Sequence, residues 1–280
     1  MRADRPIIAS LSSIPTRFKH LSPVLEAVLR QTIGFDEVRL YLPRRYRRFP
    51  DYDGSLPDVP KGVRIIQVDE DLGPASKVLF AARDLTSEDC DIFYCDDDHI
   101  YARDWVSRMI RQRKGRLDHC VATINDVVRH DNGIIPPPRQ PLAVKRQKAR
   151  AYDLELRARR MLARLSGRRR VKPFFKRIAK GGYGSVACGV GGVLVRPDFF
   201  DDQFYDIPPV LWAVDDFWLS GHFERKGIPI WVASHFRWPG ELPAGRVDAL
   251  YHTVIDGVDR AEANAACVRY MQDTYGIWLP

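Results

Sequence analysis

Short apolar runs alternate with helical patterns over the first hundred residues. Runs of apolar residues predict strands at 7–11, 38–42, 63–68 and 91–95. Apolar side chains recur three and four positions apart in Leu21–Arg30, and a second helical segment ends near Leu85. This β-α-β-β-α-β order is typical of a mostly parallel sheet flanked by helices, so we predict an α/β protein.

The remainder of the chain shows the same kinds of element at wider spacing. Helices are predicted at 105–112, 216–225 and 259–275, and strands at 120–125, 189–195 and 228–232. The glycine-rich strand at 189–195 predicts a close approach by another backbone or a ligand. The 280 residues show no internal repeat, and we predict one domain over 1–280.

Composition excludes several classes of protein. A hydrophobic share of 45% predicts a packed core, and no window approaches 18 consecutive apolar residues. The N-terminus lacks the long apolar region and cleavage site of a secretory signal. The five cysteines are odd in number and show no C-x-x-C pair, which favours reduced thiols over zinc ligands. We therefore predict a cytoplasmic protein.

The net charge of +8 is concentrated in one segment. Residues 139–180 contain 16 Lys or Arg against Asp153 and Glu155, a net charge of +14, so the remainder carries −6. We interpret this as an acidic body with a basic insertion.

Three consecutive aspartates, Asp96, Asp97 and Asp98, follow the predicted strand 91–95. Alternate residues of an extended chain point the same way, so Asp96 and Asp98 are expected to converge while Asp97 faces elsewhere. Paired carboxylates suit Mg²⁺ or Mn²⁺, and ligands of open α/β sheets bind beyond the carboxyl ends of the strands. A solvated acidic turn is the alternative.

The chain resembles the GT-A-fold glycosyltransferases that use nucleotide-sugar donors, with a family 2-like pattern. The matching features are residues 7–13, Asp96-x-Asp98, Gly191-Gly192 and the acidic helix start at 213–219. The resemblance implies a Rossmann-like GT-A domain in which residues 1–100 bind the nucleotide sugar and 101–280 form the acceptor half. It also implies a divalent metal and a UDP-sugar donor, with Asp96 and Asp98 as metal ligands.

The same resemblance assigns further residues to the donor site. It predicts nucleotide contacts by residues that follow the strands or open the next helix: Ser10, Ser12, Arg17, Asp69, Asp71, Lys77, Asp96 and Asp97. In some relatives a late histidine completes the metal site, and the candidates here are His235 and His252. Ordinary turn and capping roles are the alternatives for each.

The second acidic pair, Asp215 and Asp216, begins a predicted helix. Inverting transfer needs a base for the acceptor hydroxyl, and a carboxylate whose pKa is raised by burial or by a like charge suits that role. We predict the base within this pair and favour Asp216, since Asp215 is the better helix cap. One or two rings are expected to stack on sugar, from Trp212, Phe217, Trp218, Trp231 and Trp238.

The basic insertion contains an amphipathic helix, with Leu154, Ala158, Met161, Leu162 and Leu165 on one face. Such a helix suits an anionic membrane, which would place the protein peripherally on the inner face of the membrane, near a lipid-linked acceptor. An acidic polysaccharide, a partner subunit, or a stripe packed on the protein's own core are the alternatives.

The function predicted overall is metal-dependent glycosyl transfer to a glycan or lipid-linked acceptor in cell-surface polysaccharide synthesis. The rival enzyme class is a nucleotidyltransferase, but the turn Ser12–Arg17 lacks the glycines expected there. A nucleic-acid-binding protein is disfavoured by the acidic body and the lack of a known motif. A non-catalytic nucleotide-sugar-binding module stays open.

Overall fold

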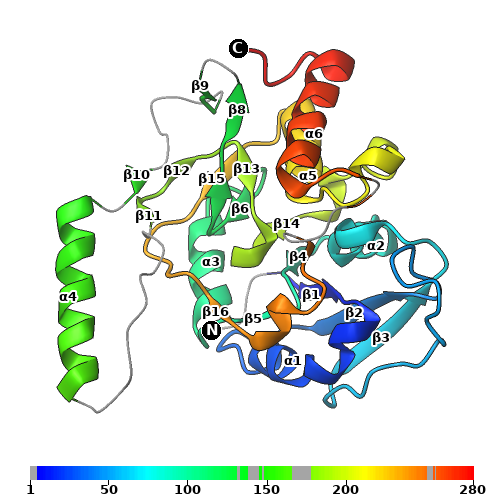
Figure 1. Ribbon diagram of the computed structural model, residues 1–280, viewed down its shortest axis with the longest axis horizontal. Helices are drawn as coiled ribbons and strands as arrows, with labels where there is room; N and C mark the ends of the chain where they lie inside the picture. Colours follow the sequence, from blue (N-terminus) through cyan, green and yellow to red (C-terminus); the bar gives the residue numbers. More distant parts are fainter. Residues whose placement is uncertain are drawn as a thin grey trace.

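Eight strands form the central sheet (Figure 1). They are β1 Ile7–Ser12, β2 Glu37–Pro43, β3 Val63–Val68, β4 Asp91–Tyr94, β6 Cys120–Ala122, β12 Gly182–Tyr183, β14 Val193–Val195 and β15 Ile230–Val232. Their order across the sheet is β12-β15-β6-β14-β4-β1-β2-β3. β1 pairs parallel with β2 and β4, β2 with β3, and β15 with β6. β14 is antiparallel to β4 and β6, and β12 is antiparallel to β15.

The structure is a computed structural model that describes residues 5–130, 133–137, 145–146, 148–165, 178–250, 255 and 257–280. Eight short strands in this part form two-stranded sheets beside the main one, in the pairs β10-β11, β13-β7, β16-β5 and β8-β9. Their bounds are β5 His99–Ile100, β7 Asn125–Asp126, β8 Val128–His130, β9 Gly133–Ile135, β10 Lys145–Arg146, β11 Ile178–Lys180, β13 Val186–Ala187 and β16 Gly240–Glu241.

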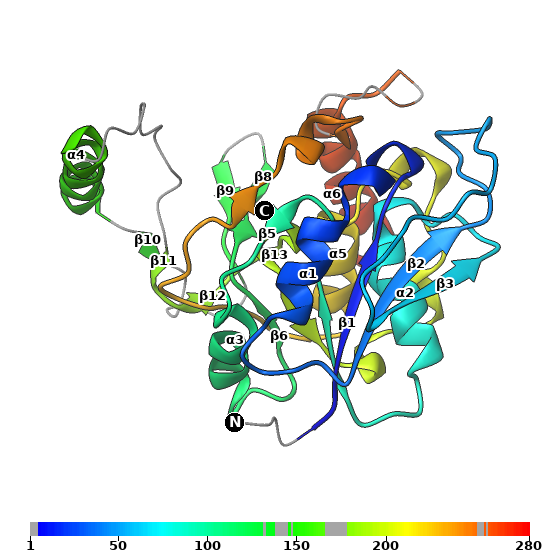
Figure 2. The same cartoon turned by 90° about the horizontal axis from the view of Figure 1, so that it is seen from below.

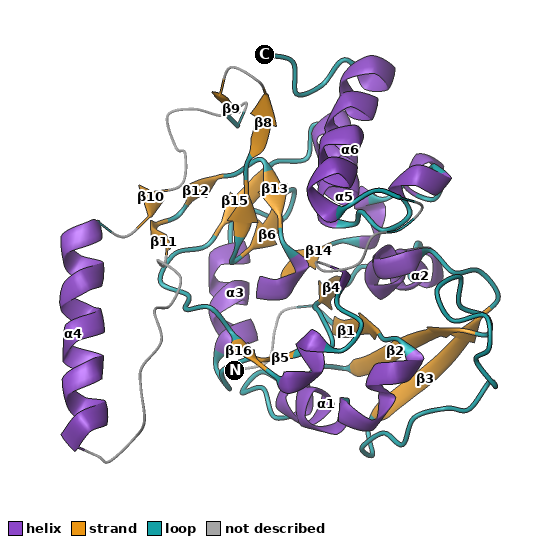
Figure 3. Ribbon diagram, in the orientation of Figure 1, coloured by secondary structure: helices purple, strands orange, loops and turns teal. Residues whose placement is uncertain are grey.

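Helices cover both faces of the sheet, which makes three layers (Figures 1, 2 and 3). The described helices are α1 Ser22–Leu29, α2 Ser76–Asp84, α3 Trp105–Arg113, α4 Ala149–Leu165, α5 Asp216–Arg225 and α6 Arg260–Tyr275, and all of them except α4 pack on the sheet. α1 and α3 share a core with one face of the sheet, and α2, α5 and α6 share a core with the other. None of these described helices combines the length and the apolar character that a bilayer span needs.

The alternation of side chains in β4 explains the two cores. Ile92 and Tyr94 belong to the core that includes α2 and α5, while Phe93 belongs to the core that includes α1 and α3. A strand buried on both faces reads as a continuous apolar run, and this is the pattern that predicted it. The predicted fold class, an α/β protein with a mostly parallel sheet flanked by helices, is confirmed.

Two predicted strands are shorter than expected. The strand at 120–125 ends at Ala122, and Gly189–Gly191 form a short 3-10 turn, so the strand at 189–195 begins only at Val193. Gly192 has a φ of 73°, and a Cβ there would lie 2.5 Å from the ring of Phe93. The glycines therefore form a close-packed turn rather than extended chain.

The basic insertion includes α4, which stands to one side of the sheet beyond β10 and β11 (Figure 1). Its apolar residues Leu154, Met161 and Leu165 are exposed. The alternative that the stripe packs on the protein's own core is therefore wrong.

Candidate active site

A cavity of about 520 Å³ opens at the carboxyl ends of β1 and β4, between the starts of α2 and α5. The aromatic part of its lining is Tyr46, Phe49, Trp212, Phe217 and Trp238. Of the rings predicted to meet sugar, Trp212, Phe217 and Trp238 line the cavity, while Trp218 is fully buried in the core.

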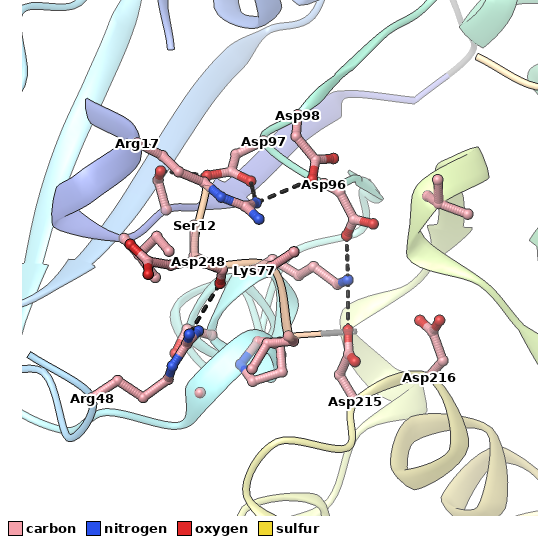
Figure 4. Close-up of a pocket in the computed structure, with 18 of the residues that line it drawn as sticks. Ser12, Arg17, Arg48, Lys77, Asp96, Asp97, Asp98, Asp215, Asp216 and Asp248 are labelled. Carbon is pink, nitrogen blue, oxygen red and sulfur yellow. Dashed lines mark hydrogen bonds and ion pairs between the residues drawn. The ribbon is translucent and has the colours of Figure 1, made fainter. Parts of the chain in front are cut away.

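The acidic turn after β4 lies on one wall of this cavity (Figure 4). Asp97 is buried and turns inward, where it accepts hydrogen bonds from the hydroxyl of Ser13 and from Arg17 Nη1 at 2.7 Å. Asp96 and Asp98 are partly exposed. All three aspartates line the cavity, but Asp97 is anchored by Ser13 and Arg17 while Asp96 and Asp98 are the more exposed members of the turn.

Asp96, Asp98 and His99 form a candidate metal site. One ligand atom from each lies within 4.8 Å of the others. Burial raises the pKa of Asp98, but the hydrogen bond from His99 and the charge of Arg17 outweigh it and lower the pKa below its ordinary value. Asp98 is thus an ionised oxygen donor at neutral pH. The two carboxylates offer the oxygen donors that Mn²⁺ and Mg²⁺ both take, and the imidazole beside them favours Mn²⁺ over Mg²⁺.

The histidine beside the aspartates is therefore His99, for which no role was predicted. His235 is exposed after β15, with its N–H bonded to the carbonyl of Ile178, and it is not among the described residues that line the cavity. The group of possible metal ligands among the described residues does not include it either, so its role in the metal site stays a prediction. His252 lies outside the described residues.

Lys77 joins the two acidic clusters across the cavity floor (Figure 4). It is buried in the first turn of α2, with Nζ 2.5 Å from Asp96 Oδ1 and 2.6 Å from Asp215 Oδ2. Asp215 also accepts a hydrogen bond from Arg260 Nη2 at 2.9 Å. Burial opposes ionisation of both partners, but the opposite charges prevail: the pKa of Lys77 is raised and that of Asp215 is lowered well below its usual range.

Asp215 occupies the cap position of α5, yet its side chain makes no capping hydrogen bond. The expected capping role is therefore wrong, because the buried Lys77 and the partly buried Arg260 bind this carboxylate instead.

Asp216 differs from its neighbour in both contacts and charge. Its Oδ1 accepts a hydrogen bond from the N–H of Gly189 at 2.9 Å. Burial, together with the negative charge of Asp215, raises the pKa of Asp216 to about 7. Two adjacent carboxylates thus have pKa values that are driven apart, which is a common arrangement in acid–base catalysis.

The predicted nucleotide-contact residues divide into two groups. The residues of this set that line the cavity are Ser12, Arg17, Asp71, Lys77, Asp96 and Asp97. Asp71 also shapes its rim, because its carboxylate accepts hydrogen bonds from the N–H groups of Arg47 and Gly73.

Ser10 and Asp69 do not lie at the cavity. Ser10 is fully buried within β1, where its backbone pairs with Arg39 and Tyr94 in the neighbouring strands. The side chain of Asp69 is 91% exposed and pairs with Arg44 at 3.0 Å, beyond the edge strand β3. Neither position fits the predicted contact with a nucleotide.

Several lining residues had no predicted role, among them Arg48, Asp248 and Arg260. Arg48 belongs to a stretch rich in Tyr and Arg, and its Nη2 donates to the carbonyl of Asp248 at 3.0 Å. Arg260 is the first residue of α6, where a cation opposes the helix dipole. An arginine at this unfavourable position is the sequence feature that could have indicated a partner elsewhere in the chain, which is Asp215.

The sequence matches no family model and no curated protein. Solved structures that resemble the chain include GalNAc-T7 with UDP, GalNAc and Mn²⁺, at a TM-score of 0.53 and 12% identity. That match covers 97% of this chain and 49% of GalNAc-T7, so the chain spans about half the length of that relative. The chain has a GT-A fold.

A second similar structure is Staphylococcus aureus TarS in complex with UDP, at 11% identity and a TM-score of 0.43. This match covers 85% of the chain and 60% of the TarS chain in that structure, residues 1–349.

Proposed function

We propose that the protein is a metal-dependent glycosyltransferase that uses a UDP-sugar. The observation that carries this proposal is the pairing, across one cavity, of the candidate metal site at Asp96, Asp98 and His99 with the Asp215–Asp216 pair. The GT-A fold supports it, as does GalNAc-T7, a structural neighbour with UDP and Mn²⁺.

Asp96 and Asp98 would hold the divalent ion, with His99 beside them. When bound, such an ion neutralises charge on the diphosphate as it leaves. The two aspartates suit this role because they are the partly exposed members of the acidic turn. Arg17, 3.1 Å from Asp98, keeps one Asp98 oxygen oriented.

Asp216 is the proposed base. With a pKa of about 7, it is partly ionised at neutral pH and takes a proton from the acceptor hydroxyl. The hydroxyl oxygen then bonds to the anomeric carbon as the bond from that carbon to the diphosphate oxygen breaks. The proton ends on Asp216 and the electron pair on the diphosphate, and direct displacement of this kind inverts the anomeric centre.

The proposed acceptor is a glycan or a lipid-linked sugar in cell-surface polysaccharide synthesis. Three aromatic residues of the cavity wall, Trp212, Phe217 and Trp238, offer surfaces on which sugar rings stack. A lipid-linked acceptor would require the protein to work at a membrane surface.

The first experiment is a thermal-shift panel of UDP, GDP, CDP, TDP and ADP, each with and without Mn²⁺. A ligand at a hundred times its dissociation constant adds about 2.7 kcal/mol to the free energy of unfolding. We expect a shift with UDP only when Mn²⁺ is present, and Asp98→Ala should abolish it. A shift that persists in Asp98→Ala would refute the metal site. Activity assays then separate the rival functions. Nucleotide binding without sugar transfer would identify a non-catalytic module, and release of pyrophosphate from a nucleoside triphosphate and a sugar phosphate would identify a nucleotidyltransferase.

A further inference from the structure

Helix α4 presents its apolar side chains to solvent. The exposed fractions are 71% for Leu154, 60% for Met161, 61% for Leu162 and 79% for Leu165. At 100° per residue these positions form a single stripe along the helix. Exposed apolar surface of this size on one helix marks an interaction site rather than chance exposure.

The opposite side of α4 faces the protein. Glu155 lies 3.6 Å from Arg237, which follows β15, and it also accepts a hydrogen bond from Arg159 at 2.9 Å. Tyr152 and Leu156 on this side are partly buried. Tyr152 and Leu156 lie roughly 140° and 180° around the helix from the centre of the stripe, so their partial burial orients the stripe away from the body, while Glu155 contacts the body at the edge of the stripe.

Arginines line one edge of the stripe. Arg157, Arg160 and Arg164 are all exposed and lie three or four positions apart, so they form one row. The surrounding segment, 139–180, has 16 basic residues against two acidic ones, whereas the rest of the chain carries −6. The positive charge of this row therefore lies beside the apolar stripe.

We propose that α4 is a membrane-docking helix that lies flat on an anionic lipid surface. Its apolar stripe enters the interface and the arginine row binds lipid phosphates, as in interfacial amphipathic helices. An acidic polysaccharide would satisfy the arginines but leave the four large apolar side chains in water. Lipid matches both features, and 17 residues extend the helix over about 25 Å of surface.

This surface is separate from the cavity and does not depend on the identity of the donor. It supplies what a lipid-linked acceptor needs, a protein held at the plane where that acceptor lies. Juxtamembrane Lys and Arg each strengthen binding to anionic lipid about fivefold. Three arginines therefore account for about a hundredfold.

The test is co-sedimentation of the full chain with vesicles of phosphatidylcholine alone or of phosphatidylcholine mixed with phosphatidylglycerol. We expect binding to the mixed vesicles only. Met161→Asp combined with Leu165→Asp should lower the partition coefficient by more than about tenfold. The apolar variant Met161→Leu should bind like the parent. Ile134→Asp, at a site 56% exposed on β9, is the matched control.

A second set of variants tests the charge. Arg157→Gln, Arg160→Gln and Arg164→Gln together should weaken binding about a hundredfold, while Arg111→Gln on α3 should not change it. Equal binding of the parent protein to neutral vesicles would overturn the preference for anionic lipid. Undiminished binding by the variant that combines Met161→Asp with Leu165→Asp would overturn the role of α4. Binding to an acidic polysaccharide with none to vesicles would replace lipid as the partner. The UDP–Mn²⁺ thermal shift of each variant keeps this test separate from the donor site.

Discussion

Replacement of Asp216 is the sharpest test of the proposed chemistry. Burial and the adjacent charge of Asp215 raise the pKa of Asp216 to about 7. A base acts only when it is ionised, and a raised pKa means that ionisation is lost as the pH falls through 7. The ionised fraction is about 10% at pH 6 and about 90% at pH 8. Turnover should therefore fall about fivefold from pH 7 to pH 6, approach a tenfold fall per pH unit below that, and reach a plateau above pH 8.

Asp216→Asn removes the proton acceptor but keeps the shape of the side chain. General base catalysis contributes about 10²–10⁴-fold, so kcat should fall by that factor. Because the remaining rate no longer depends on this carboxylate, the slope below pH 7 should disappear. The hydrogen bond from Gly189 is preserved, since the amide still offers an oxygen.

The assay is release of UDP from a UDP-sugar with water as acceptor, followed from pH 5.5 to about 9. Asp126→Asn is the matched control, because Asp126 also lines the cavity but is exposed. It should retain turnover within about twofold. If Asp216→Asn keeps near-normal turnover and the same pH profile, Asp216 is not the base and the proposed mechanism fails.

Two further predictions concern the groups around the cavity. His99→Ala should weaken Mn²⁺ binding about 10–100-fold in a calorimetric titration with UDP present, whereas His235→Ala should not. The reverse result would restore the late histidine to the metal site. Lys77→Met should lower the free energy of unfolding in urea by about 3–5 kcal/mol, because Asp96 and Asp215 lose a shared buried cation. A loss below about 1 kcal/mol would show that Lys77 is not a structural link.

The parts of the site that depend on short-range order could be predicted. An apolar strand followed by acidic residues places Asp96 and Asp98 at the end of β4, because strand ends are where an open α/β sheet binds ligands. The outward stripe of α4 was visible as a period in the sequence. What the period did not reveal is which side of the helix faces the body, since that depends on contacts such as Glu155–Arg237.

The parts that depend on long-range contacts could not be predicted. Asp215 binds Arg260, which lies 45 positions later in the sequence, and Lys77, which lies 138 positions earlier. Ser10 is a case in which the local sequence predicted a contact that the fold does not allow. Its residue type suited a nucleotide contact, but its depth within β1 is decided by the strands on either side. Local pattern thus located the strand ends, while the fold decided which polar groups meet there.

The charge of the cavity explains why a divalent cation belongs there. The described lining residues include eight aspartates, against Arg17, Arg48, Lys77 and Arg260, a formal charge of −4 in a chain of net charge +8. A nucleoside diphosphate is itself an anion, so this surface repels it at close range. Lys77 and Arg260 are held by Asp215, and Arg17 is held by Asp97 and Asp98. Because these cations are already paired with carboxylates, they do not offset the remaining negative charge. A cation bound from solution would reduce that charge and so allow the anionic donor to bind. Metal dependence is therefore expected for nucleotide binding itself, and not only for the reaction that follows.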